Sequence, residues 1–118
     1  PMLATMQVNK ARMQEIVKGG FINATDAADY LAKKGVAFRE AHAIVGQLVA
    51  YAERKGCGLE DLSIAELQEF SPVFENDIYR YINIENCVAA RKVPGGPAPE
   101  AVKTAIEAGR KWLKMEQK

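Results

Sequence analysis

The sequence has few of the residues that build metal sites, disulfides and membrane spans. Its two cysteines, Cys57 and Cys87, lie far apart, and neither has a second cysteine or a histidine at ligand spacing, so we predict no zinc site. Two reduced thiols in a cytoplasmic protein are expected. No apolar run approaches the roughly 20 residues of a membrane-spanning helix, and the N-terminus lacks a signal-peptide pattern. We therefore expect a cytoplasmic chain with neither metal nor membrane contact.

An excess of charge of either sign is also absent. Lysine and arginine number 16 against 15 aspartate and glutamate in 118 residues, and the two signs are interspersed along the chain. A nucleic-acid-binding surface needs clustered basic residues, so nucleic acid is not a predicted partner. The length and the 48% hydrophobic content are typical of one globular domain that folds without a metal or a disulfide.

Strand-like alternation is missing, whereas signals that begin and end helices recur. Asn9 is placed to cap a helix that Gly19 and Gly20 end, and either Asn23 or Thr25 is placed to cap the next one. Further on, a capping box is predicted at Ser63 and Glu66, a second helix start at Ser71 and Pro72, and an N-cap at Asn83.

The longest predicted helix lies in residues 35–56, "GVAFREAHAIVGQLVAYAERKG". Its apolar side chains recur at spacings of three and four and predict one buried face, made of Phe38, Ala41, Val45, Leu48 and Ala52. Gly56 is expected to end this helix. Gly46 lies inside it, which suggests that another backbone passes close to it.

A loop and a last helix complete the pattern. The segment "VPGGPAP" predicts a rigid surface loop, because its prolines and glycines exclude a helix. It lacks the lysine and the preceding strand of a phosphate-binding loop. An amphipathic helix follows from Pro99, and we expect Trp112 to anchor it. The fold class is therefore predicted to be all-α, a small orthogonal domain of about seven mostly short helices.

No complete catalytic motif accompanies this fold. His42, the only histidine, could act as a general base, but it lies at the shoulder of the apolar face, where a structural role is the preferred interpretation. Arg39 and Glu40 could bind a ligand carboxylate or a partner, although such residues in a first helical turn usually face solvent. We therefore predict no catalytic residue, and we retain Arg39, Glu40 and His42 as candidates for contact with another domain.

Three segments in register carry a family resemblance. They are "GFINATDAADYLAKKGVAFREAHAIVG", "LEDLSIAELQEFSPVFENDIY" and "CVAARKVPGGPAPEAV". In this order they resemble the C-terminal domain of argininosuccinate lyases, members of the fumarase and aspartase superfamily that includes the δ-crystallins. The resemblance implies that residues 1–18 are the end of a central helical domain and a connector, and that residues 19–118 form the C-terminal domain. Met2, Leu3 and Met6 would then be buried in the intact enzyme and exposed in this chain.

The resemblance also implies an activity for the whole enzyme, the cleavage of argininosuccinate to arginine and fumarate by a homotetramer without a cofactor. The family's catalytic serine loop, of the type G-S-S-x-M-P-x-K-x-N-P, and its Thr-His pair do not occur here. This chain alone is therefore predicted to be inactive, with the enzyme's other domains and subunits as its partners. The alternatives are a free-standing helical interaction module or a helix-turn-helix binding domain, and a crystallin-like relative of the enzyme.

Overall fold

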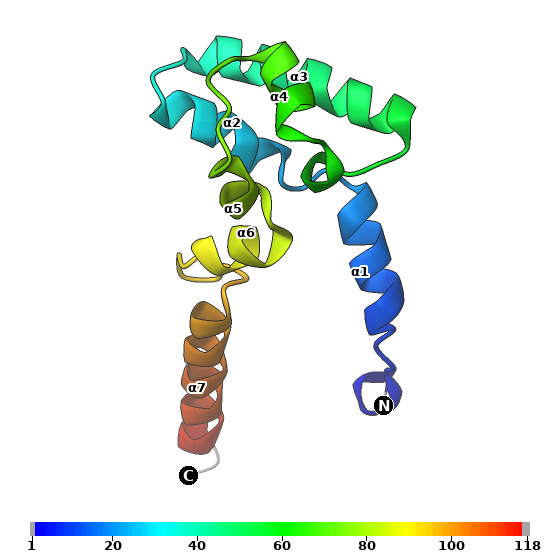
Figure 1. The fold of residues 1–118 in the computed structure, drawn as a ribbon. Coiled ribbons are helices and arrows are strands. Elements are labelled where there is room, and N and C mark those ends of the chain that lie inside the picture. Colours follow the sequence, from blue (N-terminus) through cyan, green and yellow to red (C-terminus); the bar gives the residue numbers. More distant parts are fainter. Residues whose placement is uncertain (1, 117–118) are drawn as a thin grey trace. The chain divides into compact units, whose positions relative to one another are not determined.

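The computed structural model describes residues 2–116, and all the regular structure in that range is helical (Figure 1). This confirms the predicted all-α class. The seven α-helices and two 3₁₀ helices of that range are η1 (Met2–Thr5), α1 (Lys10–Gly19), α2 (Ala24–Lys33), α3 (Phe38–Lys55), η2 (Leu59–Asp61), α4 (Ile64–Phe70), α5 (Ile78–Ile82), α6 (Ile84–Ala90) and α7 (Pro99–Glu116). The chain divides into two compact units, Pro1–Ile82 and Asn83–Lys118, which are described separately.

Side-chain caps begin several of these helices, as predicted. The Asn9 side chain accepts the N–H of Arg12 at 3.0 Å at the start of α1. At the start of α4, Ser63 accepts the N–H of Glu66 at 3.3 Å, and Glu66 in turn accepts the N–H of Ser63 at 2.9 Å. These bonds satisfy backbone donors that have no partner inside the helix.

Asn23 occupies the N-cap position of α2, but its side chain does not cap the helix. It is buried, and its Nδ2 donates a hydrogen bond of 2.8 Å to the carbonyl oxygen of Ile82 at the end of α5. Because this bond joins residues far apart in the sequence, local pattern could not predict it. It ties the start of α2 to the end of α5.

The core of the first unit forms where α2 packs on α3 and on α5. The predicted apolar face of α3 is buried except at its first residue, Phe38, which is 62% exposed. The expectation for Phe38 was wrong, because its ring lies along the same helix against His42, with ring centroids 4.5 Å apart. The fully buried large side chains of the unit are Tyr30, Leu31, Leu48, Leu59, Leu62, Leu67, Phe74, Ile78 and Ile82.

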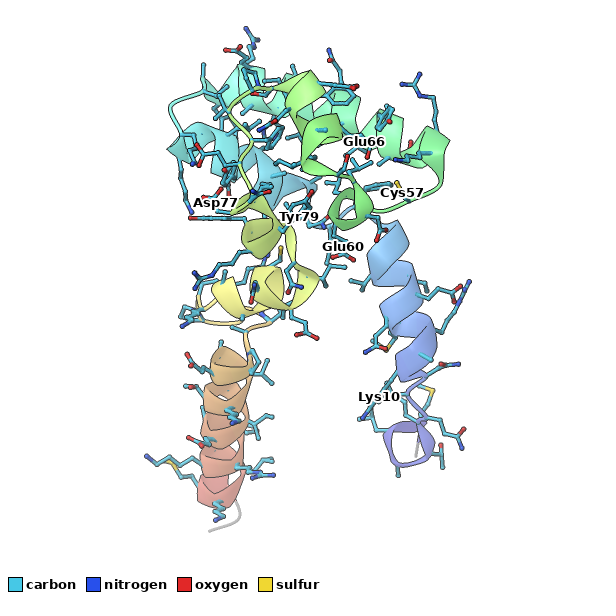
Figure 2. All side chains as sticks on the ribbon, viewed as in Figure 1. Lys10, Cys57, Glu60, Glu66, Asp77 and Tyr79 are labelled. Carbon is cyan, nitrogen blue, oxygen red and sulfur yellow. The ribbon has the colours of Figure 1, made fainter. Side chains whose placement is uncertain are left out.

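A second network holds α2 to the segment that precedes α5. The hydroxyl of Tyr30 donates to Asp77 at 2.5 Å and accepts the N–H of Glu75 at 3.3 Å. Lys34, which follows the last residue of α2, pairs with Glu75 at 2.8 Å and lies 3.7 Å from Asp77, which is labelled in Figure 2. Burial raises the pKa of Tyr30, so the hydroxyl stays protonated and remains a donor.

The helix expected from Ser71 and Pro72 is a single turn, and α5 begins only at Ile78. Phe74 donates its N–H to the carbonyl of Ser71 at 3.2 Å, and its own carbonyl accepts the side chain of Gln68 at 2.8 Å. These bonds direct the fully buried ring of Phe74 into the core. Tertiary packing therefore overrides the local start signal.

In the second unit, the Asn83 side chain caps α6 by accepting the N–H of Asn86 at 3.1 Å, as predicted. Residues 93–98 form a loop, as predicted, and Pro99 begins α7. In this loop the N–H of Gly96 donates to the carbonyl of Val93 at 2.8 Å. A side chain at Gly96 would collide with the backbone of Arg91 and Val93. The turn therefore requires glycine at this position.

Replacement by alanine should have opposite effects on stability at two glycines, Gly46 within α3 and Gly56 just after its last residue. Gly46 has open space where a side chain would lie, so the backbone expected near it is absent, and Gly46→Ala should stabilise the fold by about 0.5–1 kcal/mol through helix propensity. Gly56 ends α3 in the left-handed region with φ 73°, so Gly56→Ala should cost about 1 kcal/mol. Urea denaturation of both variants checks the signs. Equal effects would contradict this assignment.

Candidate functional site

The three sequence-predicted candidates lie together on the first turns of α3, and all three side chains are exposed. Arg39 and Glu40 follow Phe38, and the ring of His42 lies against the ring of Phe38 at an interplanar angle of 39°. The ring of Phe38, which was predicted to be buried, thus lies exposed beside them. The group forms an exposed aromatic and charged surface, and its contact with another domain stays a prediction.

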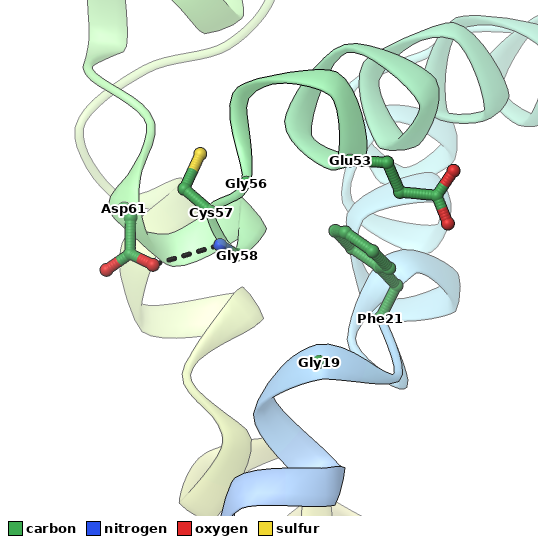
Figure 3. Close-up of a pocket in the computed structure, with 7 residues that line it drawn as sticks. All are labelled: Gly19, Phe21, Glu53, Gly56, Cys57, Gly58 and Asp61. Carbon is green, nitrogen blue, oxygen red and sulfur yellow. Dashed lines mark hydrogen bonds between the residues drawn. The ribbon is translucent and has the colours of Figure 1, made fainter.

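A hollow of about 350 Å³ lies at the other end of α3 (Figure 3). It is lined by Gly19, Phe21, Glu53, Gly56, Cys57, Gly58 and Asp61. It was not predicted from the sequence, because its walls come from two stretches that lie far apart along the chain, residues 19–21 and 53–61. The sequence signals at this place are the lining glycines Gly19, Gly56 and Gly58, which indicate a change of chain direction.

The hollow does not hold a catalytic arrangement. Asp61 accepts the N–H of Gly58 at 3.0 Å, so one carboxylate oxygen already closes the turn. Figure 3 shows the carboxylate of Glu53 pointing away from Asp61. General acid–base work needs groups that converge on one reacting atom, and these two carboxylates do not.

Metal-binding chemistry is also missing from the part of the chain that the structure describes. No group of three or more histidine, cysteine, aspartate or glutamate side chains there could hold a metal ion. Cys57 is partly exposed and Cys87 is buried. Among the described helices, none is both long and apolar enough to cross a membrane.

A cluster of charged and polar side chains surrounds Glu66 of α4 (labelled in Figure 2). Its carboxylate accepts hydrogen bonds from Lys55, from Tyr51 at 2.7 Å and from the Ser63 hydroxyl at 2.9 Å. The pairing with Lys55, followed by the Ser63 backbone N–H, lowers the pKa of Glu66 to about 2. Because Tyr51 and Lys55 belong to α3 and Glu66 to α4, these bonds join α3 to α4.

Acid should therefore weaken this α3–α4 connection. The folded-state pKa of Glu66 lies below the unfolded value of about 4.3, so its contribution to stability is present above that value and is lost as the pH falls toward about 2. Glu66→Gln should lower the free energy of unfolding near pH 7. The difference from the native chain should shrink as the pH falls toward about 2. Unfolding free energies measured across this range test the effect, with the exposed Glu69→Gln on the same helix as control. A difference between Glu66→Gln and the native chain that does not change with pH would contradict it.

Exposed apolar side chains gather on two segments. The residues before and within α1 expose Met2, Leu3, Met6, Val8, Met13 and Ile16, as expected for the first three of these. On α7 the exposed residues are Val102, Ile106, Trp112, Leu113 and Met115. Trp112 is 58% exposed, so the expectation that it anchors the helix was wrong. Exposed apolar surface of this kind marks places where other protein packs.

Comparison with known proteins gives a consistent result. The model of the argininosuccinate lyase C-terminal family matches residues 21–89. An argininosuccinate lyase of Desulfitobacterium hafniense (strain Y51) is 62% identical over 106 residues, which are 90% of this chain and 23% of that protein. The argininosuccinate lyase of Desulforamulus reducens is 59% identical over 115 residues, which are 98% of this chain and 25% of that protein.

Among solved structures, a variant of EDDS lyase with bound fumarate is similar to this chain, with a TM-score of 0.80 and 28% sequence identity. The similarity covers 92% of this chain and 24% of that one. The chain thus spans about a quarter of the length of the relatives it matches. The family model covers more than half of the chain, and the all-helical fold agrees with it. The chain belongs to the argininosuccinate lyase C-terminal family.

Proposed function

We propose that this chain serves as the non-catalytic C-terminal domain of an argininosuccinate lyase. The whole enzyme would cleave the C–N bond of argininosuccinate to give arginine and fumarate, as a step in arginine biosynthesis. The family match over residues 21–89, together with relatives that carry this name, is the observation that supports the proposal most strongly. The solved lyase of similar fold, whose variant holds fumarate, agrees with it.

The domain's contribution would be structural. The described residues hold no converging acid–base pair around the hollow at the end of α3, and the Glu66 donors are used within the fold. By contrast, the first turns of α3, the residues before and within α1, and α7 all expose apolar or aromatic side chains. Such surfaces fit packing against the enzyme's other domains and subunits.

The finer assignments are part of the same proposal. Residues 1–18 would be the end of the central domain and a connector, and residues 19–118 the C-terminal domain. Arg39, Glu40 and His42 would contact a neighbouring domain. The complete enzyme would be a cytoplasmic homotetramer that needs no cofactor, with neither nucleic acid nor membrane among its partners.

The direct test is an assay of the chain by itself. Purified chain incubated with argininosuccinate should release no fumarate above the buffer control, while a complete argininosuccinate lyase assayed beside it does so readily. Fumarate release in proportion to the amount of chain added would overturn the non-catalytic assignment. Circular dichroism of the same sample shows that the helical fold is present during the assay.

A further inference from the structure

The segment between α1 and α2 has an unusual backbone. Phe21 has φ 46° and is the only non-glycine residue with positive φ in the part of the chain that the structure describes. In this left-handed region the Cβ atom of an L-residue crowds the backbone, so the conformation persists only where surrounding contacts enforce it. The contacts on the two sides of Phe21 differ strongly.

On its C-terminal side, the chain is fixed to the core. The half-buried ring of Phe21 packs against the core and lies at the hollow formed by the end of α3 (Figure 3). The Phe21 carbonyl accepts the N–H of Ala24 at 3.0 Å. Two residues after Phe21, the buried side chain of Asn23 donates to the carbonyl of Ile82 at 2.8 Å. Ring, carbonyl and amide together hold residues 21–24 in place.

On its N-terminal side, the chain is held much less. Every side chain of α1 that the structure describes is exposed, except for the half-buried Val17. Gly19, the last residue of α1, and Gly20, which follows it, restrict backbone rotation little. The φ torsion of Phe21 is therefore the first rotatable bond outside the anchored segment. Because α1 is about 15 Å long, a rotation there moves its far end over a large arc.

We propose that Phe21 is a two-state joint that sets the direction of α1. With its ring seated beside the end of α3, the backbone is held in the left-handed state and α1 has one direction relative to α2 and α3. When the ring leaves, φ returns to the ordinary negative range and α1 swings away. The joint is a property of this chain, and its failure would leave the proposed function untouched.

Backbone N–H residual dipolar couplings of the whole chain in solution test the joint. In the native chain, the couplings of α1 and α3 should fit one alignment tensor. In Phe21→Ala, which removes the ring contacts that hold the positive φ, the couplings of α1 should shrink and no longer fit the tensor of α3. The couplings of α2 and α3 should remain as in the native chain, because the rest of the core is unchanged. Phe21→Tyr keeps the ring and should retain the common tensor.

A matched control and a milder variant keep the test decisive. Phe38→Ala removes an equally large but exposed ring from the other end of α3 and should leave α1 aligned with α3. Phe21→Leu keeps an apolar anchor, so it should fold even where Phe21→Ala does not, and it should show a smaller loss of alignment. A native chain whose α1 already fails the common tensor would overturn the joint, and so would Phe21→Ala and Phe21→Leu variants whose α1 fits it as well as in the native chain.

Discussion

Replacing Phe74 by alanine is expected to lower the free energy of unfolding by about 3–5 kcal/mol. Its ring is 0% exposed and stacks on Tyr30, with centroids 6.1 Å apart and planes 6° apart. Truncation removes these contacts and leaves a cavity that the helices around it can fill only in part. Domains of this size are stable by only about 5–15 kcal/mol, so the variant should lose a large fraction of its stability.

Urea denaturation followed by circular dichroism measures this loss, and Phe38→Ala is the matched control. Phe38 is 62% exposed, so the same substitution there should cost less than about 1 kcal/mol. The comparison isolates burial, because the residue type and the truncation are identical. Equal losses at the two positions would contradict the description of the core.

Replacing Asn23 by aspartate is the second large effect expected, about 3 kcal/mol or more near pH 7. The substitution has nearly the same shape but replaces a buried amide donor with a carboxylate oxygen. That oxygen would face the carbonyl of Ile82, which Nδ2 of Asn23 contacts at 2.8 Å. Two acceptors then face each other in a buried position, and a charge is removed from water as well.

The pH dependence of this variant has a definite sign. Burial beside a carbonyl raises the pKa of the carboxyl that Asn23→Asp introduces, so that its folded-state value lies above its unfolded value of about 3.9. The destabilisation is therefore complete above the folded-state pKa and shrinks as the pH falls toward about 4, where the protonated carboxyl can donate to Ile82.

Unfolding free energies of Asn23→Asp, Asn23→Ala and the native chain at several pH values check this sign. The alanine variant loses the hydrogen bond without gaining a titrating group, so its difference from the native chain should stay nearly constant. A constant difference for the aspartate variant too would contradict the buried contact between Asn23 and Ile82.

The features predicted correctly from the sequence are those whose cause is local. Asn9, Ser63 and Asn83 cap helices because a short polar side chain can reach a backbone N–H three residues ahead. Gly56 ends α3 because glycine accepts positive φ without strain. The periodicity of α3 likewise identified Ala41, Val45, Leu48 and Ala52 as buried.

The features that were missed depend on residues far apart in the sequence. The start signal at Ser71 could not reveal that Phe74 is drawn into the core beside Tyr30. A helical wheel assigns Phe38 and Trp112 to apolar faces, but it contains no information on which turns of a helix are covered by another element. For the same reason the hollow beside Phe21 was not predicted, since its walls come from α1, α3 and η2 and from the turns beside them.

The most direct test of the proposed function is a chimeric enzyme. The corresponding C-terminal quarter of the Desulfitobacterium hafniense argininosuccinate lyase, which is 62% identical to this chain, would be replaced by this chain, and fumarate release from argininosuccinate measured. The proposal predicts that the chimera cleaves argininosuccinate, whereas a chimera with Phe74→Ala, whose domain is destabilised, shows reduced activity. A folded, assembled chimera with no fumarate release would contradict the assignment of this chain as the C-terminal domain of such an enzyme.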